Sequence, residues 1–311
     1  MALGRSLSPG AATFSPHDIL FPHEVTRFPI MTSTPPFLTI CDRDTGEAPM
    51  ALFHGFLESP ALWRALPAKL WGGRRTVALP LPGHAPWCTD RPTLEALLRD
   101  DAFLDAYAAT LRALAPGRAW RLVGHSTGAM IALALARRAP DLVEDVCAIS
   151  PLFSGLVAGR NLQGAIVRLP VLGQMSFRWL MGRWLADAAT FREGVRTVTV
   201  QPRPKLGAFD GVREDLRASD LDRIYRFGCW IGQQDMSADL IHIERPVLAM
   251  ICDRDPVVRP DHQLALIRQA PQASAVVLRS GHLPMLESPQ AFQKAFLAWR
   301  SSREAPPLPR W

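Results

Sequence analysis

The pattern Gly-x-Ser-x-Gly occupies residues 124–128, with Ser126 at its centre. An apolar run (120–123) precedes it and an alanine-rich run (129–138) follows, which predicts a strand, a sharp turn and a helix. A serine on such a turn holds its hydroxyl clear of the sheet, as a nucleophile requires. A side chain at either glycine would collide with neighbouring backbone, and the free N–H groups that begin the helix favour an anion. The pattern is short enough to arise by chance, so the rest of the chain must decide.

A serine hydroxyl needs a base that takes its proton, and that base is typically a histidine held by a carboxylate. After a turn of this kind the carboxylate and then the histidine follow the serine along the chain. Downstream of Ser126, His282 lies in a loop after a strand-like run and can reach back over the sheet. We expect His262, in a polar helix start, to be solvated, and His242 has no obvious orienting group. His282 is therefore the expected base.

Two aspartates directly after the strand-like run 246–251 compete for the third position. Asp255 is followed by a Pro-Val-Val segment that turns the chain away, and we predict that it orients His282. Asp253 is the alternative. The aspartate that is not used is expected to satisfy its own loop, as turn aspartates commonly do.

The segment His54-Gly55-Phe56 follows another strand-like run, 49–53. An oxyanion hole needs two N–H donors beside the reacting carbonyl. We expect one from Thr127, next to the nucleophile, and one from Phe56, because the preceding glycine lets the backbone approach closely. Substrate contacts are also assigned to the adjoining residues His54, Gly55 and His125.

Taken together and in order, these segments resemble the α/β-hydrolase superfamily, in its single-insertion branch of small esterases, C–C bond hydrolases and haloperoxidase-like enzymes. The resemblance covers about residues 37–303, and its four signatures lie at 54–56, 124–128, 253–258 and 281–287. It implies a catalytic triad of Ser126, Asp255 and His282, a fold of mostly parallel strands, and no metal or organic cofactor.

The sequence departs from the family pattern in two places. Cys252 replaces the glycine usual before the Asp-x-Asp segment, and the turn 79–85 lacks the usual aspartate and ends in Ala85. The second departure touches the rim of the site and not the triad. Ser126 stands where dehalogenases and epoxide hydrolases of this family carry aspartate, which argues against those two activities.

Strand-like and helix-like segments alternate, and most of the strands are uniformly apolar. This predicts an α/β fold with a mostly parallel, doubly wound sheet covered by helices on both faces. The expected strands are 37–41, 49–53, 76–79, 120–123, 145–149, 246–251 and 275–278, and the expected helices are 93–115 (with Thr93 as N-cap), 129–138 and 289–300. The expected organisation is an extended or disordered arm (1–35), a core (36–151 and 245–303), a helical cap (152–244) and a loose tail (304–311).

The stretch 152–244 is rich in tryptophan and arginine and interrupts the core. Both of its ends lie at the carboxyl edge of the sheet, where ligands bind in open α/β folds. Its aromatic residues are candidates to line an apolar cavity, although packing on the core explains most of them equally well: Phe177, Trp179, Trp184 and Trp230. Its arginines either stay solvated, which we favour, or attract an acidic substrate or a membrane surface.

Composition narrows the partners of this chain. Its 311 residues carry a formal charge of +6, mostly from scattered arginines, with no basic and aromatic groove for nucleic acid. The cysteines are isolated and odd in number, which predicts a reducing compartment and no metal site. No leader-like segment and no run of about 18 apolar residues is present. We therefore expect a cytoplasmic protein without stable membrane insertion, and the oligomeric state is left open.

The leading hypothesis is hydrolysis of a carboxylic ester or thioester that has an apolar part, through an acyl-enzyme on Ser126. The same triad also serves C–C bond hydrolysis or acyl transfer, and the cap would decide between them. A hypothesis of another class is a ligand-binding protein that keeps the fold with an idle triad, since fold alone does not prove activity.

Overall fold

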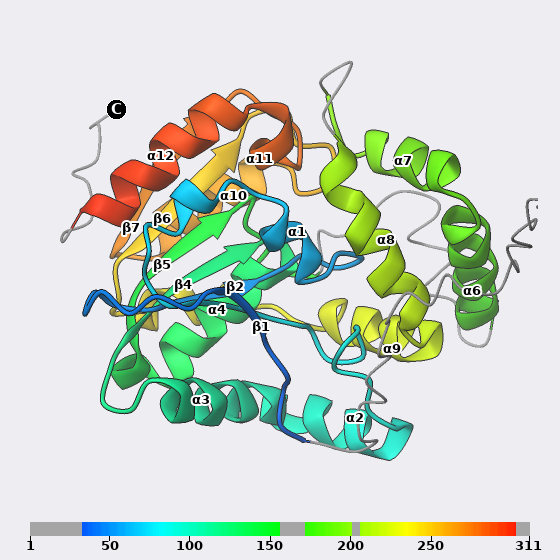
Figure 1. Cartoon of the computed structure of the whole chain (residues 1–311), viewed down its shortest axis with the longest axis horizontal. Coiled ribbons are helices and arrows are strands. Elements are labelled where there is room, and N and C mark those ends of the chain that lie inside the picture. The colour runs from blue at the N-terminus through cyan, green and yellow to red at the C-terminus, as the bar shows by residue number, and fades with distance from the viewer. Residues whose placement is uncertain (1–32, 156–171, 201–205, 303–311) are drawn as a thin grey trace, which may run out of the picture.

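The computed structural model describes residues 33–155, 172–200 and 206–302. Nearly all of the predicted N-terminal arm (1–35) and the whole predicted tail (304–311) lie outside these residues. The described chain forms a layered α/β structure with a group of helices at one end, as Figure 1 shows.

The sheet has seven strands in the order β1-β3-β2-β4-β5-β6-β7. Only β1 runs antiparallel, against β3, and every other pairing is parallel. The mostly parallel sheet of the prediction is confirmed. The strands are β1 (Leu38–Cys41), β2 (Met50–Phe53), β3 (Thr76–Leu79), β4 (Trp120–His125), β5 (Val143–Ile149), β6 (Val247–Cys252) and β7 (Ala273–Leu278).

Helices cover both faces of the sheet, as the uniformly apolar strands predict. On one face Leu122 and Ala249 pack with α3, α4 and α10, and on the other Val123 and Met250 pack with α1 and α12. The core helices are α1 (Ala61–Arg64), α2 (Arg91–Leu98), α3 (Ala102–Leu114), α4 (Thr127–Arg138), α10 (Pro260–Gln269), α11 (Pro284–Glu287) and α12 (Pro289–Ser301). Short 3₁₀ turns are η1 (Ala68–Leu70), η2 (Arg99–Asp101), η3 (Pro140–Leu142), η4 (Leu206–Ala208) and η5 (Leu240–His242).

The single helix predicted over 93–115 is wrong, because two helices, α2 and α3, meet at a break. Asp100 and Asp101 adopt left-handed backbone with φ of 52° and 57°, which no continuous right-handed helix accepts. The cap of α2 is Asp90, whose Oδ1 accepts the N–H of Thr93 at 2.8 Å, so Thr93 lies inside the first turn.

Between β5 and β6 the chain forms a helical insertion that lies beside the carboxyl ends of the strands (Figure 1). Its helices are α6 (Leu172–Leu185), α7 (Ala188–Arg196), α8 (Phe209–Ala218) and α9 (Leu221–Ile231). The Ala85 N–H donates to Ser219 Oγ at 2.8 Å, and the His282 N–H donates to Val198 O at 3.1 Å. The insertion is therefore joined to the loops that leave the sheet at this edge, and its predicted limits of 152 and 244 stay a prediction.

Candidate active site

Ser126 joins the end of β4 to the start of α4 with φ 53° and ψ −114°, a backbone that L-residues rarely adopt. A Cβ at Gly124 would lie 2.2 Å from Gly128 O, and a Cβ at Gly128 would lie 2.2 Å from Phe53 O. Both positions therefore exclude side chains for the steric reason inferred from the sequence. The turn places Ser126 at the carboxyl edge of the sheet, beside the end of β2, which pairs Phe53 with Gly124.

His282 and Asp255 are in direct contact. The Nδ1 atom of His282 lies 2.7 Å from Asp255 Oδ2, and both side chains are buried. Asp255 is held in turn by the N–H groups of Val257 and Val258, both on Oδ1, and by Gln263 Nε2 on Oδ2. Nδ1–H of His282 thus points to the carboxylate, which leaves Nε2 as the nitrogen able to accept a proton.

Asp253 has a different environment. Its side chain is exposed, and Oδ1 accepts the Ser280 N–H at 3.2 Å, within the loops around it. The structure brings Asp255 and not Asp253 to His282.

The predicted oxyanion donors can be compared with the N–H group of neighbouring Gly55. The Gly55 N–H is already bound by Glu58 Oε2 at 2.6 Å. The N–H groups of Phe56 and Thr127 have no acceptor among the residues that the structure describes. Their N–H groups are unoccupied, whereas that of Gly55 is not, and Phe56 and Thr127 stay the predicted oxyanion donors.

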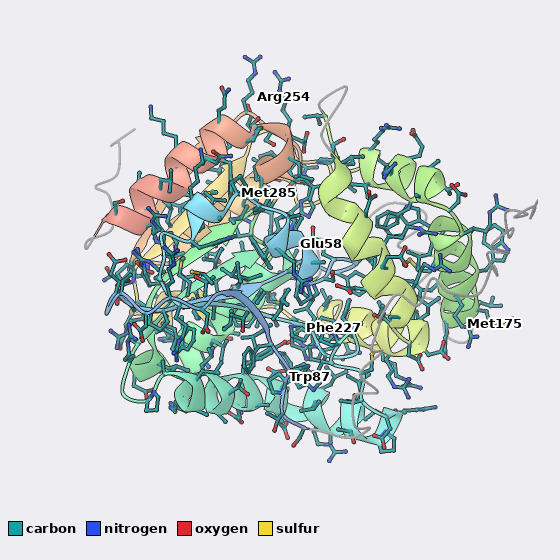
Figure 2. All side chains as sticks on the ribbon, viewed as in Figure 1. Glu58, Trp87, Met175, Phe227, Arg254 and Met285 are labelled. Carbon is teal, nitrogen blue, oxygen red and sulfur yellow. The ribbon has the colours of Figure 1, made fainter. Side chains whose placement is uncertain are left out.

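A buried ion pair that the sequence analysis missed lies behind His282. Glu58 Oε2 is 3.0 Å from His125 Nδ1, and His125 Nε2 is 2.8 Å from the carbonyl oxygen of His282. Both nitrogens of His125 therefore face acceptors, which indicates the imidazolium form. Figure 2 marks Glu58 near the carboxyl edge of the sheet. The ion pair links the loop that follows β2 (residues 54–58, here called the oxyanion loop), the turn at Ser126 and the loop that holds His282.

Each member of this pair stabilises the charged form of the other, which opposes the effect of burial on their pKa values. Burial lowers the pKa of His125, but the charge and hydrogen bond of Glu58, together with the His282 carbonyl and the charge of Asp255, raise that pKa above its usual value. Burial likewise raises the pKa of Glu58, but the charge and hydrogen bond of His125 bring that pKa below its usual value. No signal in the sequence singles out Glu58 among turn carboxylates, and His125 was assigned only to substrate contact.

Glu287 ties the His282 loop to the insertion. Its buried carboxylate accepts the N–H groups of Gly281 at 3.2 Å, Leu283 at 3.1 Å and Val200 at 2.7 Å. The loop on either side of His282 is thereby fixed, together with the end of the insertion segment that follows α7.

His54 is a packed, neutral part of the oxyanion loop. Its Nε2 accepts the Leu81 N–H at 3.1 Å, so the proton sits on Nδ1, which lies 2.9 Å from Gly55 O. Burial lowers the pKa of His54 to about 4 and that of neighbouring His84 to about 3. Both rings stay uncharged near neutral pH and support the aromatic wall around Phe56.

The four aromatic residues predicted to line a cavity go to different places. Phe177 on α6 stacks on Phe56 at 6.4 Å between ring centroids and therefore lies over the oxyanion loop. Trp179 is 67% exposed and is not brought to the site. Trp184 packs inside the insertion on Phe191, and Trp230 packs on the core, where its Nε1 donates to Asp101 Oδ1.

His262 differs from expectation. Its ring stacks on Phe153 at 3.9 Å between centroids, and Nε2 accepts the Phe153 N–H at 3.3 Å. Burial lowers its pKa to about 4. His262 is half-buried rather than fully solvated, because Phe153 in the loop after β5 stacks on its ring.

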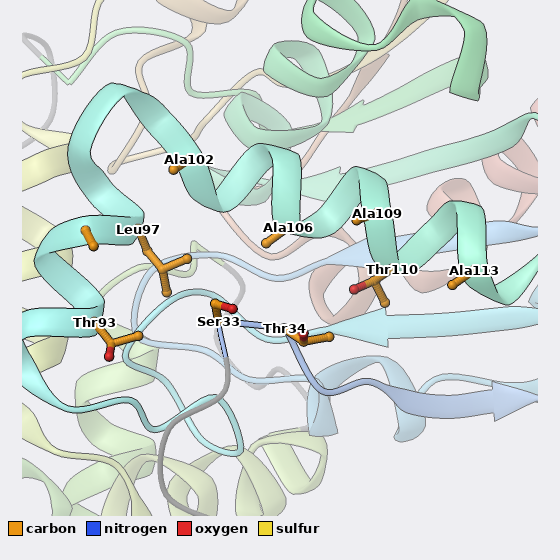
Figure 3. A pocket seen from close by; sticks show the side chains of 10 residues that line it. Ser33, Thr34, Thr93, Leu97, Ala102, Ala106, Ala109, Thr110 and Ala113 are labelled. Atoms are coloured by element: carbon orange, nitrogen blue, oxygen red, sulfur yellow. The ribbon is translucent and has the colours of Figure 1, made fainter.

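A groove of about 580 Å³ lies elsewhere, along α2 and α3, and is lined by small residues such as Ala102, Ala106 and Ala109 (Figure 3). It includes none of the candidate catalytic residues. Among the described residues, no group of three or more His, Cys, Asp or Glu side chains is placed to hold a metal. Within the same ranges, no helix has the length and apolar character needed to cross a bilayer.

Residues 50–295 match the sequence model of the alpha/beta hydrolase family, and the chain belongs to that family. It is 27% identical over 265 residues to the dihydrolipoyllysine-residue acetyltransferase component of the acetoin cleaving system of Pseudomonas putida, covering 82% of this chain and 64% of that protein. It is 35% identical over 113 residues to 2-(acetamidomethylene)succinate hydrolase of Mesorhizobium japonicum, covering 36% of this chain and 39% of that protein. The chain thus spans less than two thirds of each of these relatives.

Solved structures share the fold at low identity. The structure of E-2-(acetamidomethylene)succinate hydrolase superposes with a TM-score of 0.66 at 20% identity, covering 86% of this chain and 95% of that one. The enol-lactonase of Burkholderia xenovorans LB400 gives a TM-score of 0.60 at 19% identity, covering 86% of this chain and 96% of that one.

Proposed function

We propose that the protein hydrolyses a carboxylic ester or thioester with Ser126 as nucleophile, His282 as base and Asp255 as its orienting carboxylate. The observation that carries the proposal is the buried contact of 2.7 Å between His282 Nδ1 and Asp255 Oδ2. Ser126, on its strained turn, directly follows His125, whose ring centroid lies 4.8 Å from that of His282. The proposed substrate is a small ester with an apolar part, because Phe56 and Phe177 form an aromatic wall over the oxyanion loop.

The proposed chemistry proceeds through an acyl-enzyme. Ser126 Oγ attacks the acyl carbon while its proton passes to His282 Nε2, and Asp255 stabilises the resulting imidazolium. The Phe56 and Thr127 N–H groups hold the oxyanion. His282 then gives the proton to the leaving alcohol or thiol. Water attacks the acyl group by the same route, which releases the acid and restores Ser126. These steps use only the groups of the chain named above, the substrate and water.

A panel of p-nitrophenyl esters with acyl chains of increasing length, together with an acyl thioester, tests this proposal. We expect p-nitrophenol release from the parent protein and a loss of about 10⁶ in kcat for Ser126→Ala. Ser237→Ala serves as the matched control, because Ser237 is a half-buried turn serine whose hydroxyl donates to Asp235 Oδ1.

Four results would redirect or overturn the proposal. Acyl groups that appear on an added alcohol rather than in the free acid would favour acyl transfer. Absence of turnover on every ester and thioester, with cleavage of a vinylogous diketone, would favour C–C bond hydrolysis. Turnover by Ser126→Ala within tenfold of the parent would remove Ser126 from the mechanism, and no turnover of any of these compounds would favour a binding protein.

A further inference from the structure

Helix α6 is apolar on two opposite faces. Its inward face buries Phe177, Met181 and Leu185 against the rest of the insertion. Its outward face exposes large apolar side chains, since Leu172 is 59% exposed and Met175 is 65% exposed. A helix on the surface of a protein normally carries polar residues on the face turned to water.

The outward residues form one continuous line. Leu172, Met175 and Trp179 follow each other at intervals of three and four residues, which places them on one side of the helix. Arg183 continues the line, with its guanidinium carbon 5.4 Å from the centroid of the Trp179 ring. We call these four residues the α6 stripe. Figure 2 shows Met175 at the outer edge of the insertion, turned away from the sheet.

The charges that α6 itself carries have one sign. Within Leu172–Leu185 the helix has no Asp or Glu and two arginines, Arg178 and Arg183. Arg178 is paired with Asp222 of α9 at 2.9 Å, so Arg183 is the cation that the stripe itself presents. An apolar line that includes tryptophan and ends in arginine matches a surface with apolar interior and anionic face.

We propose that the α6 stripe docks the protein on the surface of an anionic lipid bilayer, with α6 lying in the plane of the interface. A single helical line is narrow for a stable protein dimer, which buries about 800 Å² on each partner. It is sufficient for interfacial binding, in which the apolar side chains enter the boundary between headgroups and acyl chains and cations meet the headgroups. This docking is separate from hydrolysis and needs neither Ser126 nor His282.

Docking through the α6 stripe would bring the bilayer near the candidate active site, an inference that rests on the proposed function. Phe177 on the opposite face of α6 stacks on Phe56 of the oxyanion loop. The docked helix would thus separate the bilayer from the candidate active site by its own thickness. An ester that partitions into lipid would then leave the bilayer close to Ser126.

Co-sedimentation with vesicles tests the docking. The full chain is mixed with phosphatidylcholine vesicles and with vesicles that also contain phosphatidylglycerol. We expect the parent to bind the anionic vesicles, and more weakly as salt is added. Leu172→Ser/Met175→Ser should bind at least about tenfold more weakly than the parent, and Arg183→Gln about fivefold more weakly. The matched control is Ile241→Ser/Val277→Ser, which removes side chains on η5 and β7 that are 62% and 52% exposed. Circular dichroism verifies that each variant is folded.

Two sedimentation results would overturn the docking proposal. Absence of sedimentation of the parent at millimolar lipid, or equal binding by the parent and Leu172→Ser/Met175→Ser, overturns it. A parent that elutes as a dimer in size exclusion, becomes monomeric in that variant and ignores vesicles would assign the stripe to a second copy of the chain. Ser126→Ala should bind vesicles like the parent, which separates failure of docking from failure of the proposed hydrolysis.

Discussion

The loops of the core and the helices of the insertion hold their functional candidates in different ways. At the carboxyl edge of the sheet, Asp255, His282, His125 and Glu58 are buried and each has a defined polar partner. In the insertion the aromatic candidates scatter between the site, the interior and the solvent. Residues that leave parallel strands are delivered to one edge by the sheet itself, whereas a helix distributes its side chains around an axis that only packing can orient.

Asp253 and Asp255 give the sharpest test of how the loops of the core hold their functional side chains. Asp255→Asn should keep the fold and lower kcat by about 10⁴, because an amide holds the wrong tautomer of His282. Asp253→Asn, two residues away but exposed, should stay within tenfold of the parent. Steady-state kinetics on one p-nitrophenyl ester measures both. A large loss in Asp253→Asn with little loss in Asp255→Asn would exchange the two roles.

Glu58 tests whether the buried ion pair supports the edge. Glu58→Gln should lower the free energy of unfolding by ~3 kcal/mol, because it leaves His125 buried without its carboxylate. Asp141→Asn, which breaks the exposed pair with Arg112, should change that free energy by no more than ~0.5 kcal/mol. Urea denaturation at neutral pH compares the two, and equal effects would show that the buried pair has no special weight.

The effect of Glu58→Gln should also depend on pH. The raised pKa of His125 gives stability that is full below its ordinary value of 6.5 and is lost as the pH rises through the pKa of the folded state. The lowered pKa of Glu58 gives stability that is full above its ordinary value of 4.5 and is lost as the pH falls. The difference between parent and variant should therefore be largest between these two values.

Within the insertion, Phe177 and Trp179 lie on the same helix and should respond differently. Phe177→Ala should raise KM for long acyl esters about tenfold, because it removes an aromatic wall above Phe56. Trp179→Ala should leave KM for a soluble ester within twofold, since its side chain faces solvent. A larger effect at Trp179 would mean that α6 turns its outward face to the substrate.

The smallest expected effect concerns His262. Its pKa is lowered to about 4, so below pH 6.5 the unfolded chain takes up a proton that the folded chain refuses, and stability falls with pH down to about 4. His262→Gln should reduce the proton uptake on unfolding by up to about one proton in this window. Above pH 7 the two stability curves should run parallel. An unchanged slope between pH 4 and 6.5 would contradict the half-buried environment of the ring.

Much of the fold was predictable because it follows from backbone chemistry. Apolar runs fixed the strands, and the glycines around Ser126 mark a turn where any side chain would meet backbone at 2.2 Å. The break at Asp100 was not predictable from periodicity, since the apolar pattern continues across it. Those residues hold left-handed backbone, and Asp101 accepts Trp230 Nε1 from another part of the chain.

The candidate site divides in the same manner. Asp255 and His282 follow strands, so their meeting at one edge could be expected from the chain order. The Glu58–His125 contact joins positions 67 residues apart, and no motif around Glu58 in the sequence predicts that His125 is its partner. The faces of α6 could not be assigned either, because a helix that is apolar on opposite sides gives no period that identifies its buried face.

Labelling with a fluorophosphonate tests the central claim, that Ser126 is an activated nucleophile, most directly. The reagent reacts with a serine only where a base and oxyanion donors activate it. The account predicts one adduct per chain, mapped by mass spectrometry of peptides to Ser126 and absent from Ser126→Ala and, on the same time scale, from His282→Gln. Labelling of another residue, or a parent protein that stays unlabelled while folded, would contradict it.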